Sequence, residues 1–415
     1  MTKEQTFLLS LLATAVDPAR EKPDPADLSA DGWDKLIGES LFQAVGYLTF
    51  TLCESFQDRI PSELYQKWNR AVIKTLGRNR NIATAQNELI ALLGDHPYLI
   101  LKGLASATYY PNPALRDFGD VDFLVAEDLQ EEVAQILLAA GYQKANEGND
   151  HHLVFKKPFY HLELHREPPG IPDGEIGKKI RSFLSSWQES TVLQTLDSDY
   201  LHVAFRAPSP VQHGLILLLH MQHHMVNEGL GLRHLLDWGF FVAKTKDQPF
   251  WQEELLPLLE QVGLLTYAAA MTKTCALYLG VPEPAFCRDV PEDLCAAVME
   301  DVFLLGNFGV KDRGRSHSGG MIATPDGKSP RKKGLLWLFH KTVMEKHPVL
   351  RRVPILYPVF AIWELFAYGI GLLLGKRTRP SKLLRDAKER RTLYDRFAIF
   401  QVGNTRSDVP ADSIS

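Results

Sequence analysis

The feature that most constrains this fold is a short stretch in which two aspartates alternate with large apolar residues directly after a glycine. The stretch "GDVDFLVA" covers residues 119–126. In an extended strand its valines and phenylalanine point to one face, whereas Asp120 and Asp122 point to the opposite face. A buried carboxylate is costly unless it is paired or bound to a cation. The stretch therefore predicts a strand with one apolar face and one face that meets a cationic group.

A third carboxylate lies in a second apolar stretch, "YHLELHRE", at 160–167. In a strand, Glu163 shares its face with His161 and His165. If this strand lies beside the first, three carboxylates come together, and such oxygen ligands suit Mg²⁺ or Mn²⁺ in phosphoryl transfer. The alternatives are solvated turn aspartates in the first stretch, and a glutamate on an edge strand paired with Arg166 or His165.

The chain of 415 residues alternates between helical and strand-like patterns. Apolar residues at three- and four-residue spacings predict helices before and after a region of short strands. We therefore expect an α+β fold, with a small mixed β-sheet flanked by helical N-terminal and C-terminal segments. The expected divisions are a helical segment at 1–95, an α/β core at 96–200, a helical domain at 201–310, a flexible linker at 311–334 and a C-terminal helical segment at 335–415.

A phosphate-binding element is predicted just before the acidic stretch, in "ILKGLASATYY". A strand here ends at Lys102 and Gly103 and is followed by small residues that suit the start of a helix, where backbone N–H groups can hold phosphate. Lys102 offers a point charge and Arg116 a planar fork for phosphate oxygens. Surface salt bridges are the alternative role for these two cations.

Taken together, these residues resemble a bacterial family of uncharacterised nucleotidyltransferases and, more distantly, the polymerase-beta-like nucleotidyltransferases. The resemblance covers roughly residues 30–245, including the later "HLELH" and the helical positions of His220 and Asp237. It rests on this set of motif residues: Lys102-Gly103, Tyr110-Pro111, Arg116 and Asp120-Val121-Asp122 followed by Leu124-Val125.

The resemblance implies a metal-dependent enzyme that moves a nucleoside monophosphate from an NTP to a sugar, a small molecule or a protein. It implies that Asp120, Asp122 and Glu163 are the catalytic carboxylates and ligands of Mg²⁺ or Mn²⁺. One departure is that Gly103 is followed by Leu104, where the superfamily has Gly-Ser, so Ser106 or Lys102 would have to compensate. A catalytically inactive nucleotide-binding or partner-binding module is therefore the alternative.

Histidines in "LLLHMQHHMV" raise the question of a zinc site. His220 and His224 are four residues apart and so share a helix face. No H-E-x-x-H pattern and no obvious third ligand accompany them, which favours histidines that face the active cleft or are satisfied in the core. Asp237 and Arg233 have the spacing of an ordinary helix pair.

The stretch at 353–375 is long enough to span a bilayer and has basic residues on both sides. Glu364 near its middle and two prolines near its start favour a buried or membrane-surface helix over a true span. Peripheral membrane contact, as in an accessory protein for envelope polysaccharide assembly, is a second alternative. The net charge of −4 gives no reason to expect a nucleic-acid partner, and four cysteines without a C-x-x-C pair suit a cytoplasmic location.

Overall fold

The computed structural model describes residues 1–145, 152–198, 200–312, 315, 335–374 and 379–402. Most of the linker predicted at 311–334 therefore lies outside the described residues. The N-terminal segment is helical, as the sequence predicts, and its long last helix begins directly after Pro61. Its helices are α1 (Lys3–Val16), α2 (Ala30–Phe42), α3 (Gly46–Leu52), the 3₁₀ helix η1 (Glu54–Arg59) and α4 (Ser62–Leu93).

The central sheet is small and mixed, which confirms the predicted α+β class. Its five strands lie in the order β1-β2-β5-β4-β3, and β2 and β5 are parallel whereas the other neighbours are antiparallel. β4 and β5 form a hairpin through Pro158. The strands are β1 (Tyr98–Ile100), β2 (Val121–Val125), β3 (Gln143–Ala145), β4 (His152–Lys157) and β5 (Tyr160–His165), with the short helix α5 (Leu104–Ala107) after β1 and α6 (Gln130–Ala139) after β2.

The two faces of β2 meet different parts of the protein. The apolar side chains of Val121, Phe123 and Val125 belong to a core shared with α4 and α6. Leu124, on the opposite face, belongs to the larger core, which joins helices that precede the sheet to helices that follow it. The face that carries the aspartates therefore looks toward that helical core.

A second sheet and a helical bundle follow. The boundary expected at residue 200 falls between two strands of one antiparallel hairpin, β6–β7, so a division there would split a sheet. These elements are α7 (Gly174–Leu184), α8 (Trp187–Ser190), β6 (Val192–Ser198), β7 (Leu201–Ala207), α9 (Pro210–Asn227), α10 (Leu232–Thr245), the π-helical turn η4 (Trp251–Leu255), α11 (Leu256–Gln261), α12 (Leu265–Leu279) and α13 (Glu292–Leu305).

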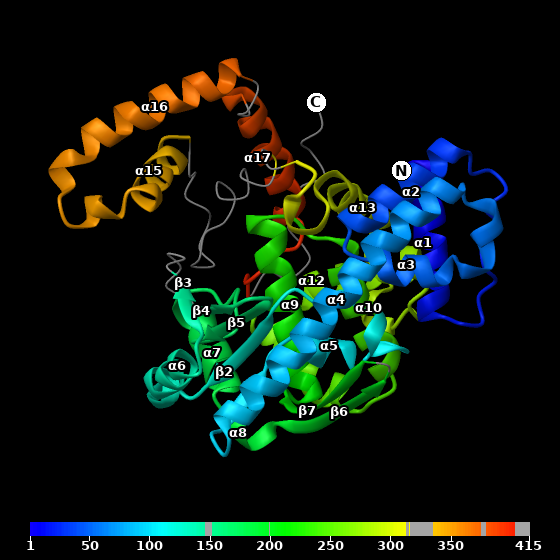
Figure 1. Ribbon diagram of the computed structural model, residues 1–415, viewed down its shortest axis with the longest axis horizontal. Coiled ribbons are helices and arrows are strands. Elements are labelled where there is room, and N and C mark those ends of the chain that lie inside the picture. Colours follow the sequence, from blue (N-terminus) through cyan, green and yellow to red (C-terminus); the bar gives the residue numbers. More distant parts are fainter. Residues whose placement is uncertain (146–151, 199, 313–314, 316–334, 375–378, 403–415) are drawn as a thin grey trace.

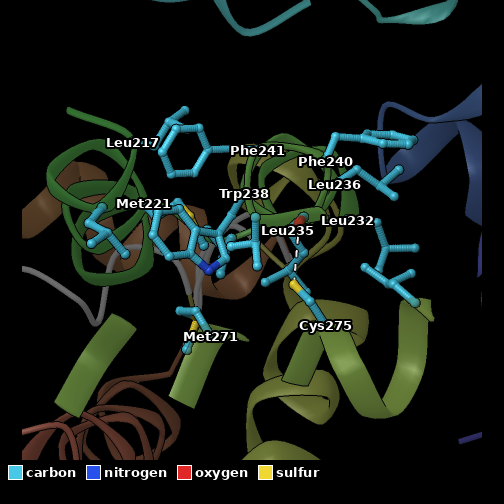
Figure 2. Close-up of a cluster of buried hydrophobic side chains, with 14 of the residues drawn as sticks. Leu217, Met221, Leu232, Leu235, Leu236, Trp238, Phe240, Phe241, Met271 and Cys275 are labelled. Carbon is cyan, nitrogen blue, oxygen red and sulfur yellow. Dashed lines mark hydrogen bonds between the residues drawn. The ribbon is translucent and has the colours of Figure 1, made fainter. Parts of the chain in front are cut away.

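The helix α10 is the centre of this bundle. Figure 2 shows Trp238 and Leu235 between side chains of α9 and α12, and the Sγ of Cys275 donates to the carbonyl of Leu235 at 3.3 Å. Trp238 is buried and its indole N–H donates to Thr272 at 2.9 Å. This packing fixes the position of α10, whose other side chains reach the site described below.

The C-terminal segment is helical, with α15 (Leu335–Lys346), α16 (Tyr357–Leu373) and α17 (Pro380–Asp395). In Figure 1, α15 and α16 form a separate arm at the edge of the molecule, and α17 returns toward α13. Salt bridges support this return, including Arg396 with Asp293 at 2.8 Å.

Candidate active site

The three predicted carboxylates come together at one end of the sheet. β2 and β5 are adjacent and parallel, and Asp122 is the register partner of Glu163. Carboxylate oxygens of Asp120 and of Asp122 each lie within 4.8 Å of an oxygen of Glu163. Because β5 lies between β2 and β4, the alternative of Glu163 on an edge strand is wrong.

Cationic and imidazole groups surround these carboxylates. The Nζ of Lys102 lies 3.1 Å from Oδ1 of Asp122, and the Nε2 of His165 lies 2.8 Å from the same oxygen. The Nε2 of His165 is also 3.5 Å from Glu163, with His152 and His161 at similar distances from that carboxylate. The cationic group that the alternating strand predicted is therefore Lys102, assisted by His165.

The surroundings shift the pKa values of the two aspartates in opposite directions. Burial, and next the charge of Asp122, raise the pKa of Asp120 to about 7. Burial would also raise the pKa of Asp122, but Lys102 and His165 outweigh it and hold that pKa well below its ordinary value. The pKa of Lys102 is raised, because attraction to the three carboxylates outweighs the effect of burial. At neutral pH the site thus holds an anionic Asp122 and a cationic Lys102.

Gly103 brings the backbone after β1 close to the acidic strand. Its φ of 67° lies in the region that favours glycine. A Cβ at this position would lie 3.6 Å from the carbonyl oxygen of Asp120. The turn at Gly103 therefore lies beside the carboxylates, as the sequence predicts, although α5 after it is only one turn long.

Ser106 does not lie among the carboxylates. It is fully buried in α5, and its hydroxyl is 3.4 Å from Nε2 of His213 on α9. The sequence placed Ser106 as a substitute for the missing serine after Gly103, but its side chain packs into the core on the α9 side. Of the two residues expected to compensate, Lys102 is the one that lies at the carboxylates.

Arg116 also has a different partner from the one expected. Its Nε and Nη2 donate to the two carboxylate oxygens of Asp237 at 2.8 and 2.7 Å. Tyr110 donates to the same carboxylate at 2.8 Å, and all three residues are buried. In the structure Arg116 therefore pairs with Asp237, and these residues hold α10 against the core.

Arg233 is a residue that the sequence interpretation missed. It does not pair with Asp237 as the helical spacing suggested; its Nη1 donates to the carbonyl of Asp117 at 3.3 Å. Its buried Nε has no hydrogen-bond partner among the described residues. Burial, and next the charge of Arg116, lower its pKa, whereas Asp120 is among the acids that raise it. Arg233 is thus a buried cation near the carboxylates with an unused donor.

Three histidines gather on the helices opposite the sheet. Nitrogens of His220 and His224 on α9 and of His234 on α10 lie within 4.8 Å of one another. The backbone N–H of Gly231 donates to Nδ1 of His234 at 3.2 Å, so the proton of that neutral ring is on Nε2. In this tautomer His234 presents an N–H donor to the cluster, rather than the lone pair that a zinc ligand needs.

The remaining contacts of the histidines indicate that they form a polar surface near the carboxylates. His224 Nδ1 lies 2.8 Å from Glu228, whereas Nδ1 of His220 and Nε2 of His234 are buried without hydrogen-bond partners among the described residues. Burial is the main cause that lowers the pKa of all three rings, and the positive charge of Lys102 also contributes in each case. The cluster therefore lies close to the carboxylate site. His234 could not be found from sequence spacing, because it comes from the next helix.

Comparison with known proteins identifies a family for this site. A sequence model of the uncharacterised nucleotidyltransferase family matches residues 29–280, which extends past the 30–245 of the motif resemblance and covers more than half of the chain. No curated protein and no solved structure gives a significant match. On the matched segment, which includes the whole sheet and α9 to α12, the chain belongs to the uncharacterised nucleotidyltransferase family.

Proposed function

We propose that this protein is a metal-dependent nucleotidyltransferase that moves a nucleoside monophosphate from an NTP to a hydroxyl or phosphate of an acceptor. The observation that carries the proposal is the register pairing of Asp122 with Glu163, which brings three carboxylates to one end of the sheet. The family match supports nucleotide transfer in general. The metal, the roles of the residues and the acceptor go beyond the family match and are part of the proposal.

The donor set fits a hard divalent cation. Asp120, Asp122 and Glu163 offer carboxylate oxygens, the ligands that Mg²⁺ and Mn²⁺ prefer. Lys102 and His165 now balance part of this negative charge through Asp122. When bound, Mg²⁺ or Mn²⁺ would neutralise charge on the NTP phosphates and on the departing pyrophosphate.

The chain's own residues have distinct tasks in this proposal. Lys102 and Arg233 supply positive charge near Asp120, where phosphates of an NTP would meet the site. Gly103 allows the backbone to approach the carboxylates closely. Arg116 and Asp237 act at a distance, by holding α10 and therefore Arg233 in place. In the transfer, the acceptor oxygen bonds to the α-phosphorus while the bond to pyrophosphate breaks.

The test is incubation of the full chain with each α-labelled NTP, a divalent metal and a lysate of acceptors. Labelled protein identifies a protein acceptor, and a labelled small molecule identifies a sugar or metabolite. The label should appear only with metal, and it should disappear with Asp122→Asn. Absence of any labelled product under all these conditions would count against transfer.

A specific observation favours the second candidate, an inactive nucleotide-binding module. Leu104 is buried after Gly103, and Ser106 faces His213, so the described site has no hydroxyl after its glycine turn. This module would bind NTP with metal but release it unchanged. Equilibrium binding of NTP measured beside the labelling assay separates the two candidates.

A further inference from the structure

The helix α16 is unusual because its apolar side chains are exposed. Within the described part of the chain, Pro354–Leu373 is long and apolar enough to cross a membrane by length and composition, and only 6% of its most apolar window is buried. Large apolar side chains with at least two-fifths of their surface exposed are Ile355, Val359, Ile362, Trp363, Leu365, Phe366, Ile370 and Leu373. Figure 1 shows α16 on an arm away from the sheet.

These side chains form one broad apolar side of α16. At about 100° per residue they fall within an arc of about 160°, centred opposite Glu364. The Glu364 side packs against α15, and the His347 ring stacks on Phe360 at 4.3 Å. A helix with one wide exposed apolar side and the other side held by protein suits a position in the plane of a membrane surface.

The single charged side chain of α16 is neutralised within the same arm. Glu364 lies 2.6 Å from Nζ of Lys346 and 3.1 Å from Nε2 of His347, at the end of α15. Its side chain is only 11% exposed. A charge near the middle of an apolar helix opposes entry into a membrane. Because α15 pairs with this carboxylate, α16 can meet lipid without exposing an unpaired charge.

Exposed basic residues stand near both ends of α16 in the chain. Arg352 precedes it, and Arg379 and Arg385 follow it, and each is exposed. Arginines beside an apolar helix attract the negative headgroups of anionic lipids. The exposed positive charge next to α16 in the chain is therefore complementary to an anionic membrane surface.

We propose that the arm formed by α15 and α16 docks the protein on an anionic lipid bilayer, with α16 immersed among the acyl chains near the surface. The exposed apolar side of α16 and the internal pairing of Glu364 carry this proposal. It is independent of nucleotide transfer.

The test is flotation of the purified full chain with vesicles of phosphatidylcholine, with and without phosphatidylglycerol. The wild type should float with the anionic vesicles and much less with the neutral ones. The double substitution Ile362→Ser and Phe366→Ser should lower the partition coefficient by about tenfold or more, since each side chain contributes through its buried apolar area. The matched control is Leu193→Ser on β6, where a leucine is 73% exposed outside the arm.

Two further measurements keep the test decisive if a variant is poorly behaved. The fluorescence of Trp363 should shift to the blue on addition of anionic vesicles, and Trp363→Phe should reduce that shift. A wild type that remains unbound to every vesicle would overturn the proposal. So would equal loss of flotation in the Leu193 control, or a lipid-free dimer that depends on Ile362 and Phe366 and does not bind vesicles.

Discussion

Asp122 and Glu163 are register partners on the adjacent parallel strands β2 and β5, 41 positions apart in the chain. Lys102, just after β1, and His165, on β5, also contact Asp122. In the proposed function this pairing supplies the ligands of the divalent cation, and the predictions about transfer depend on it.

Removal of the third carboxylate should abolish transfer while the fold persists. Glu163→Gln keeps the size of the side chain but removes a charged oxygen ligand. We expect transfer to fall by more than about 100-fold, beyond the 10- to 100-fold typical of residues that only position ligands. Rates with labelled NTP at saturating metal measure the effect. Glu189→Gln, in the short helix α8, is the control and should keep wild-type rates.

Separation of the buried pair of Arg116 and Asp237 should destabilise the protein. Arg116→Met leaves the Asp237 carboxylate buried without its bidentate partner, which costs about 3–5 kcal/mol in the free energy of unfolding. The double variant with Asp237→Leu should lose less than the sum of the single variants. Urea unfolding measures all three. The exposed pair of Lys178 and Glu175 is the control, since its removal should change the midpoint little. Additive losses in the double variant would show that the two side chains act separately.

Substitution of Arg233 should weaken nucleotide binding more than metal binding. Arg233→Gln removes a buried cation whose Nε has no protein partner among the described residues. We expect KM for NTP to rise about tenfold or more, the effect of one charge-assisted hydrogen bond, with a smaller change in kcat. Binding of Mn²⁺ without nucleotide should be unchanged. Arg206→Gln on β7 is the control, and an equal rise in KM there would contradict the role of Arg233.

His213 should make the protein less stable in acid. Burial lowers the pKa of His213 from an ordinary value of 6.5 to about 4. Below pH 6.5 the unfolded chain therefore binds a proton that the folded chain refuses, and stability falls as the pH drops toward 4. The loss amounts to about 3 kcal/mol over this range, with a slope of about 1.4 kcal/mol per pH unit.

The measurement for His213 is the free energy of unfolding in urea at several pH values between 4.5 and 7. His213→Gln should give a shallower pH dependence than the wild type, by about one proton. His202→Gln, at an exposed position on β7, should leave the slope as it is. Identical slopes in the wild type and His213→Gln would show that His213 does not titrate in this way.

Local periodicity was enough to predict β2 and β5 and the faces on which their side chains lie. Alternation placed Asp120 and Asp122 on one face, and the same rule placed Glu163 beside its histidines. That β2 and β5 are neighbours was a condition stated from the sequence, and the sheet order meets it. The small residues after Gly103 correctly predicted a helix, although not its length of four residues.

The partners of buried polar groups could not be predicted from the sequence. Arg116 and Asp237 are 121 positions apart, and only the packing of α10 on the core brings them together. Arg233 and Asp237 lie on the same helix with the spacing of a helix pair. That spacing could not show that Asp237 pairs with Arg116 instead. Ser106 was close in sequence to Gly103, yet the rotation of α5 points it at His213. Each of these errors concerned the direction of a side chain in three dimensions.

The most direct test of the central claim is binding of Mn²⁺ in the presence of NTP, measured by the electron paramagnetic resonance signal of the free ion. The wild type should remove Mn²⁺ from solution in the presence of NTP, and Asp122→Asn and Glu163→Gln should each lose most of this binding while Asp197→Asn on β6 retains it. Binding that is absent in the wild type, or equal in all four proteins, would contradict a metal site made by Asp122 and Glu163.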